Sequence, residues 1–199
     1  TTPQDGLFYK PLSVLGGTAA DKPDIISSSG TNNAGISVVQ VELKRNVDNY
    51  YWTGSSWSAI AAWVNTSGTS AWSLSMSTSI WTDGSLYTLR NRAMDSVNNT
   101  EAFGSRTFRV DASTPNSVIN PPQNGLVYDD TLTTISGASS DPDPTPGPET
   151  VPSEVLRVRV SVYRSVGTTG YWTGGASFGG TTEYFHVATD TNPWRLAAP

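Results

Sequence analysis

Apolar and polar side chains alternate in three segments of the chain, residues 39–44, 87–94 and 107–110. A period of two places successive side chains on opposite faces of a β-strand, so each segment is expected to form a half-buried strand. Clusters of Gly, Asn, Asp and Ser lie between these segments, as turns lie between strands. No segment keeps the spacing of an amphipathic helix. The pattern predicts an all-β protein of short antiparallel strands, about seven per domain.

The inward faces of these strands define a predicted core. Its members are the apolar residues of the alternating segments and one nearby tryptophan: Val39, Val41, Leu43, Trp52, Tyr87, Leu89, Ala93, Phe108 and Val110. Tyr87 stands at the start of its strand, directly after a turn that contains Asp83 and Gly84. This position is typical of a tyrosine corner, in which the hydroxyl group ties the turn to the strand. An ordinary core tyrosine is the alternative.

The chain also aligns with itself at a shift of about 120 residues, the size of a whole domain rather than of a solenoid repeat. Residues 3–9 match residues 122–128, and residues 17–21 match residues 137–141. The sequence Tyr-Trp-Thr-Gly of residues 51–54 recurs unchanged at residues 171–174. The other matching positions are Val39, Val41 and Leu43 with Val158, Val160 and Val162, and Trp63 and Trp72 with Phe185 and Trp194.

This self-similarity predicts two domains, residues 1–113 and 123–199, joined by a linker at residues 114–122. Pro115, Pro121 and Pro122 lack backbone donors, so the linker is expected to be extended and without regular structure. The second copy ends near the equivalent of Ser77, and the counterparts of strands 85–95 and 102–111 are missing. Either the sequence is a fragment of a longer protein, or strands of a neighbouring subunit complete the second domain in trans. We prefer the fragment, since the sequence also begins at a domain boundary without Met.

Four motifs resemble those of tandem bacterial Ig-like domains from large secreted and cell-surface proteins. They are residues 17–21, residues 51–54, residues 87–95 with Asn98 and Asn99, and residues 108–111 before Pro115. The resemblance implies tandem Ig-like or fibronectin-III-like antiparallel β-sandwiches, the second copy incomplete. It also implies an adhesin-like protein located outside the cell or on its surface. The neighbouring repeats or subunits are the expected partners, with strand complementation as one mode of assembly.

Composition excludes several classes of function. The net charge is −5 with only 12 Lys and Arg, whereas a nucleic-acid-binding protein clusters basic residues. The chain has no Cys, which excludes disulfides and zinc sites built on thiolates. No run of 18 apolar residues occurs, so no membrane insertion is expected in this segment. The single histidine, His186, is replaced by Val64 in the first copy, and the carboxylates form no acid–base pair. We therefore predict that the chain is not an enzyme.

Oxygen-bearing side chains gather in the loops. The candidate ligands are Asp21 and Asp141 in equivalent loops, with Asp24 and Asp143 beside them, Asp95 at a strand end before two asparagines, and Asp111 at the start of the linker. Such oxygens suit Ca²⁺, although Asp and Asn also cap turns with their own side chains. The sequence therefore predicts no cofactor, with Ca²⁺ as the one ion that these loops suit.

The tryptophans admit two interpretations. Trp52 and Trp72 recur in the second copy, which is typical of core packing. Trp57 and Trp81 do not recur at fixed positions and are candidates for stacking on a sugar ring. The preferred function is a structural or adhesive module of an extracellular surface protein or filament, spacing or assembling through Ig-like domains. The alternative is a carbohydrate-binding accessory module of a larger secreted polysaccharide-active enzyme, with a glycan as its ligand.

Overall fold

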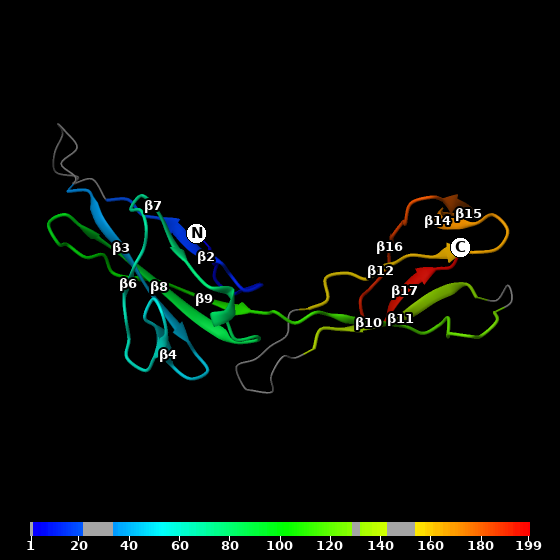
Figure 1. Cartoon of the computed structure of the whole chain (residues 1–199), viewed down its shortest axis with the longest axis horizontal. Coiled ribbons are helices and arrows are strands. Elements are labelled where there is room, and N and C mark those ends of the chain that lie inside the picture. The colour runs from blue at the N-terminus through cyan, green and yellow to red at the C-terminus, as the bar shows by residue number, and fades with distance from the viewer. Residues whose placement is uncertain (1, 22–33, 129–131, 143–153) are drawn as a thin grey trace. The chain divides into compact units, whose positions relative to one another are not determined.

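The computed structural model describes residues 2–21, 34–128, 132–142 and 154–199 (Figure 1). In these residues the chain is all-β, with strands, one short 3-10 helix at Thr78–Ile80 and no α-helix. The chain divides into two compact units, which we call unit 1 and unit 2. Unit 1 contains the described residues up to Ala112, and unit 2 contains the described residues that follow it.

Unit 1 consists of two sheets. The larger sheet has the strand order β1-β9-β8-β3-β4-β5, with β6 also paired to β3, and the smaller sheet pairs β2 with β7. The bounds are β1 (Leu7–Tyr9), β2 (Val14–Thr18), β3 (Ile36–Arg45), β4 (Tyr50–Trp52), β5 (Trp57–Ser58), β6 (Val64–Asn65), β7 (Ala71–Ser75), β8 (Leu86–Asp95) and β9 (Gly104–Val110). The antiparallel β3–β8 pair forms the centre of unit 1, and this arrangement is compatible with a β-sandwich.

The predicted core of the first domain is confirmed. Every predicted member except Ala93 is buried, and Ala93 is partly buried against the same cluster. The structure adds Leu15 and Trp72 from the smaller sheet and Met76 and Trp81 from the segment that leads into β8. The core therefore lies between the two sheets, where side chains from both are removed from water.

The predicted tyrosine corner is confirmed as well. The backbone N–H of Thr82 donates a hydrogen bond to the Tyr87 hydroxyl oxygen at 2.7 Å, across the turn that precedes β8. Gly84 in this turn has a φ of 70°, a conformation that costs glycine little and other residues more. Burial raises the pKa of the Tyr87 phenol above its ordinary value. The hydrogen bond from Thr82 acts in the opposite direction, because it favours the ionised oxygen, but burial outweighs it.

The same local geometry occurs at two other places in the chain. The hydroxyl oxygens of Tyr9 and Tyr128 accept from the backbone N–H groups of Gln4 and Gln123, each at 2.8 Å and each five residues upstream. The glycines three residues before these tyrosines have φ values of 72° at Gly6 and 77° at Gly125. Three separate turns are therefore closed by one arrangement, which we call the tyrosine turn.

The described residues of unit 2 form three small sheets. They have the strand orders β10-β11-β17, β12-β16 and β13-β14-β15. The bounds are β10 (Asn116–Ile119), β11 (Thr134–Ser140), β12 (Arg159–Val160), β13 (Tyr163–Arg164), β14 (Gly170–Gly174), β15 (Ser177–Gly180), β16 (His186–Val187) and β17 (Trp194–Ala197). The buried apolar cluster found here has five members, Ile135, Val158, Val160, Ala188 and Trp194, against twelve in unit 1.

Strand pairs in unit 2 have the same register as strand pairs in unit 1. Gly137 opposes Trp194 as Gly17 opposes Trp72, which relates β11–β17 to β2–β7. In the same way, Val160 opposes His186 in unit 2 as Val41 opposes Val64 in unit 1. Tyr163 opposes Tyr171 in unit 2 as Lys44 opposes Tyr51 in unit 1. The described residues of unit 2 include no strand that corresponds to β8 or β9.

The prediction of an irregular linker is wrong for residues 116–119. These residues form β10, which pairs with β11 so that Val118 opposes Ala138 and Ile119 opposes Gly137. The physical reason is the spacing of the prolines. Pro115 precedes the strand and Pro121 follows it, so all four strand residues keep their N–H groups.

The close approach of β10 explains why residue 137 is a glycine. A Cβ atom on Gly137 would lie 1.8 Å from the carbonyl oxygen of Val118 and 2.5 Å from the Trp194 ring. Neither neighbour has room to yield, because one is backbone and the other is the most deeply buried ring of unit 2.

The first prediction concerns the core of unit 1. Leu89→Ala removes a side chain that is 2% exposed and should lower the free energy of unfolding by about 2–4 kcal/mol. Val97→Ala, at an exposed loop position, should change it by less than about 0.5 kcal/mol. Chemical denaturation of both variants measures the difference. Equal effects would show that the inward face of β8 is misassigned.

The second prediction concerns unit 2. Gly137→Ala should destabilise it by about 1–3 kcal/mol, because the new methyl group overlaps the Val118 carbonyl and the Trp194 ring. Hydrogen exchange at the β11 amides measures the change, read against the β3 amides of unit 1. Ser117→Ala on exposed β10 is the matched control. A Gly137→Ala variant as stable as this control would contradict the close approach of β10.

Candidate functional site

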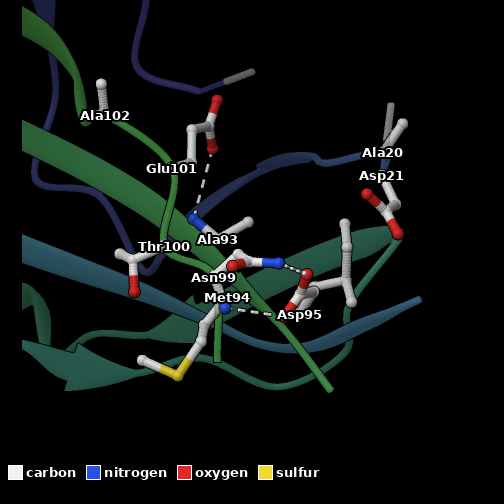
Figure 2. A pocket seen from close by; sticks show the side chains of 10 residues that line it. Ala20, Asp21, Ala93, Met94, Asp95, Asn99, Thr100, Glu101 and Ala102 are labelled. Atoms are coloured by element: carbon white, nitrogen blue, oxygen red, sulfur yellow. Dashed lines mark hydrogen bonds between the residues drawn. The ribbon is translucent and has the colours of Figure 1, made fainter. Parts of the chain in front are cut away.

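A pocket of about 460 Å³ lies where β8 ends in unit 1. It is lined by the segment after β2, by the start of β3, by the last residues of β8 and by the loop that follows them. Asp21 and Asp95, two of the candidate calcium ligands, both line this pocket (Figure 2). Glu101, which the sequence pattern did not indicate, supplies a third carboxylate to the lining.

Asp95 uses its carboxylate to close the loop after β8. One oxygen accepts from the backbone N–H groups of Val97 at 2.9 Å and Asn99 at 2.8 Å, and the other accepts from the Asn99 side-chain amide at 2.7 Å. Desolvation acts to raise the pKa of Asp95, but the bonds from Asn99 and Val97 outweigh it and lower that pKa below its ordinary value. The ionised carboxylate is therefore part of the turn.

The other two carboxylates of the pocket also accept backbone N–H groups. Glu101 accepts from Ala93 at 3.2 Å, and Asp21 accepts from Gly35 at 2.9 Å. Figure 2 shows the Glu101 and Asp95 side chains each turned toward its own donor and Asp21 standing apart from both. Among the described residues no group of three or more His, Asp or Glu side chains is placed to hold a metal ion. The arrangement is that of capped turns.

The remaining predicted ligands lie elsewhere. Asp111 is buried directly after β9, where its backbone N–H donates to the Tyr9 carbonyl at 2.8 Å. Because β8 and β9 are antiparallel, Asp111 lies at the end of the sheet opposite Asp95. Asp141 follows β11 in unit 2. Asp24 and Asp143, the expected neighbours of Asp21 and Asp141, lie outside the described residues.

Trp81, a candidate for sugar stacking, has its ring in the core of unit 1. Trp81 is 9% exposed, and its indole N–H donates to the carbonyl oxygen of Leu12 at 2.7 Å. Its ring centroid lies 4.9 Å from that of Tyr87 and 5.8 Å from that of Phe108. The residue directly precedes the tyrosine turn, so its ring is carried into the core beside Tyr87.

Trp57, the other sugar-stacking candidate, is partly buried and engaged with its neighbours. Its ring meets Trp52 edge to face at 5.5 Å, and Tyr87 lies at 6.0 Å. The guanidinium carbon of Arg45 lies 4.6 Å from the Trp57 ring centroid. One face of this ring is therefore covered by a cation, in the geometry of a cation–π contact.

The outward face of the larger sheet carries a row of charge and aromatic rings, which we call the Arg–aromatic row: Arg90, Arg92, Trp63 and Phe103. The guanidinium of Arg90 lies 4.8 Å from the Phe103 ring and that of Arg92 lies 4.1 Å from the Trp63 ring. Phe103 remains 52% exposed. The alternation of residues in β8 is enough to predict that both arginines point outward. No pattern in the sequence predicts that the Trp63 and Phe103 rings lie beside them.

An ion pair anchors the row to the sheet. The Arg90 guanidinium donates to the Glu42 carboxylate at 3.1 Å, and the Glu42 side chain is 7% exposed. Arg92 donates through Nε to the Gln40 side-chain oxygen at 2.9 Å. Both arginines are thereby held in place on the face that neighbouring molecules can reach.

The single histidine of the chain packs against aromatic rings in unit 2. The His186 ring stacks on Trp172 with centroids 3.9 Å apart, and Tyr184 lies at 4.8 Å. Its Nε2 atom lies 3.0 Å from the Trp172 carbonyl oxygen. These contacts give His186 a packing role at the position that Val64 occupies in unit 1.

In the described parts of the chain no helix is long and apolar enough to cross a membrane. Comparisons with protein-family models, with curated proteins and with solved structures find no match to this chain.

The third prediction concerns Asp95 and pH. Its lowered pKa means that the ionised carboxylate stabilises unit 1 above the unfolded-state value of about 4, and that this stabilisation is lost as the pH falls through the lower folded-state value. Asp95→Asn should therefore lower the melting temperature of unit 1 at pH 7 and change it little at pH 2. Asp190→Asn in unit 2 is the control. A difference of the same size at both pH values would contradict this account.

The same variant addresses calcium. Because each carboxylate of the pocket already accepts an N–H group, we expect identical melting curves in EDTA and in millimolar Ca²⁺. A rise with Ca²⁺ that Asp95→Asn abolishes would instead establish an ion site in the pocket.

Proposed function

We propose that this chain is a non-catalytic structural and adhesive module of an extracellular surface protein or filament, with its two units acting as Ig-like β-sandwich spacers. The observation that carries the proposal is the parallel pairing of β1 with β9, which aligns Leu7 with Phe108 and Tyr9 with Val110. The chain enters the larger sheet of unit 1 through β1 and leaves it through β9. Because β1 and β9 run in the same direction, tension applied at the start of β1 and at the end of β9 acts along both strands, which suits a spacer.

This pairing also determines how unit 1 bears tension. A pull on the two ends of unit 1 moves β1 and β9 in opposite directions along their own axes, so their hydrogen bonds are loaded together rather than one by one. Gly6 N–H donates to the Thr107 carbonyl at 2.7 Å, and the Asp5 carboxylate accepts from the Thr107 N–H at 2.6 Å and its hydroxyl at 3.0 Å. We call these contacts, with the Asp111-to-Tyr9 bond, the β1–β9 clamp.

Asp5 is the charged member of the clamp. The bonds from the Thr107 backbone and side chain, chiefly the backbone bond, lower the pKa of Asp5 below its ordinary value. The carboxylate is therefore ionised at neutral pH, and hydrogen bonds to an ionised acceptor are shorter and stronger than those to a neutral one.

The residues shared by the two units support a scaffold role. The positions that match are those that pair strands or close turns, such as Trp72 with Trp194 and Tyr9 with Tyr128. A position outside the buried core differs, with Lys44 in unit 1 and Tyr163 in unit 2. The residues that recur are those that stabilise the fold, as expected for duplicated sandwich modules. The location outside the cell depends on the resemblance to surface Ig-like domains, and the Arg–aromatic row is the surface that we assign to adhesion.

The fourth prediction tests the spacer. Asp5→Ala removes the acceptor for both Thr107 bonds and should lower the force at which unit 1 opens when the chain is stretched from its ends. Single-molecule force spectroscopy measures this force. Asp48→Ala is the control, because Asp48 pairs with Arg45 at the turn after β3 and lies outside the clamp. Opening at equal force in the Asp5→Ala variant and the unaltered chain would reject the mechanical role of the clamp.

A further inference from the structure

Unit 1 shows what unit 2 lacks. In unit 1, β9 and β8 lie between β1 and β3, in the order β1-β9-β8-β3. The sequence places a counterpart of β1 at residues 126–128, and the matching registers place a counterpart of β3 at residues 158–164. The described residues of unit 2 supply neither of the two strands that separate β1 from β3 in unit 1. Each of these two edges therefore lacks the neighbour that it has in unit 1.

The first edge belongs to residues 126–128, and the turn that precedes it is already closed. The Tyr128 hydroxyl closes the turn through Gln123, as the Tyr9 hydroxyl closes the turn before β1. In unit 1 the next N–H group, from Gly6, and the Asp5 side chain both bind β9. The equivalent groups of Gly125 and Asn124 have no hydrogen-bond partner in the described part of the chain.

Side chains at this edge are also uncovered. Leu126 is 59% exposed and Val127 is 98% exposed. The matching residues of β1, Leu7 and Phe8, are 47% and 39% exposed beside β9. The edge in unit 2 is therefore more exposed than its paired counterpart in unit 1.

The second edge belongs to residues 158–164, the counterpart of β3, which pair with other strands on one side and not on the other. The Val158 and Val162 carbonyls accept from Ala188 and Trp172 at 3.0 Å and 2.9 Å, so these residues pair toward β16 and β14. Backbone groups of successive residues in an antiparallel strand point to opposite edges. Those of Arg159 and Ser161 therefore face the other edge, where no strand among the described residues pairs with them.

The Ser161 side chain at this edge has no partner like the one that the matching side chain has in unit 1. Ser161 stands at the position of Glu42, whose carboxylate accepts from Arg90 of β8 in unit 1. The Ser161 hydroxyl is buried and has no hydrogen-bond partner in the described part of the chain. Buried hydroxyl groups are nearly always bonded, so this group indicates a missing donor or acceptor on the β8 side.

The structure points to unit 2 as an acceptor for a two-stranded antiparallel β-hairpin, supplied from outside these 199 residues and resembling β8–β9. Residues 86–110 are the one segment of the sequence in which Tyr-x-Leu leads into Phe-x-Val-Asp, and they are already paired in unit 1. The chain therefore holds no spare copy, and the hairpin belongs to another segment of polypeptide.

The acceptor also specifies the chemistry of its hairpin. In unit 1 the inward residues Tyr87, Leu89, Phe108 and Val110 join one apolar cluster with Val39, Val41 and Trp72. Val158, Val160 and Trp194 present the same face in unit 2. The first donated strand should therefore carry Tyr-x-Leu inward and the second Phe-x-Val. A hydroxyl or amide opposite Asn124 should take the place that Thr107 has opposite Asp5.

The test extends the full chain after Pro199 with a copy of residues 78–111, because Pro199 corresponds to Ser77. The backbone N–H groups of Gly125, Arg159 and Ser161 should then exchange with solvent at least about tenfold more slowly. A matched extension has the copied Tyr87, Leu89, Phe108 and Val110 replaced by Ser and should leave exchange unchanged. Equal exchange with both extensions would overturn the proposal. Amides of β3 in unit 1 serve as the internal reference.

A second measurement tests the proposal if the extended chain fails to fold. A synthetic peptide of residues 86–111 is added to the unmodified chain, and exchange at the same three amides is followed. Saturable protection supports the acceptor, whereas unchanged exchange up to the solubility limit of the peptide rejects it. Both measurements report hydrogen exchange in unit 2, whereas the stretching experiment on the β1–β9 clamp reports the opening force of unit 1. Failure of the hairpin acceptor is therefore distinguishable from failure of the spacer role.

Discussion

Unit 1 depends on the side chain of Tyr87, which no water reaches. Its ring stacks on Phe108 at 5.6 Å and meets Trp81 edge to face, so β8, β9 and the segment before β8 share one contact. Its hydroxyl holds the turn at Thr82 and thereby sets where β8 begins. The register of β8 against β3 and β9 follows from that starting point, because a strand that slips by one residue turns every side chain to the opposite face.

Unit 2 shares several strand pairings with unit 1 but not this residue. It keeps the pairing of β11 with β17, with Trp194 almost fully buried, and it keeps Val158 and Val160 inward. It has no counterpart of Tyr87 among the described residues, and its buried cluster is correspondingly small. Many of its large apolar side chains remain exposed, among them Leu156 and Val127. The contrast between the two units follows from the amount of apolar surface that two strands remove from water.

Local rules predicted much of unit 1. Period-two alternation identified β3, β8 and β9 because each has one face on the core and one in solvent, and the turn before Tyr87 has a geometry that six residues encode. The burial of Trp81 was missed because it depends on Tyr87 and Phe108, and Phe108 is distant in the sequence. The Arg–aromatic row was missed for a similar reason, since Trp63 and Phe103 reach Arg92 and Arg90 only after the sheet has formed. Strand β10 was missed because prolines on both sides hid a short run of free N–H groups.

The tyrosine turn has a consequence for the entropy of folding and binding. Each turn closes a contact between residues only five apart, so it forms at small entropic cost and without help from distant strands. In unit 1 such turns restrict the backbone at a smaller entropic cost than the long-range pairs of β3, β8 and β9. In unit 2 the turn at Tyr128 persists beside an edge that lacks its neighbour, and a strand that docks there meets a backbone whose freedom has already been lost. Preorganisation of this kind lowers the entropic cost of association.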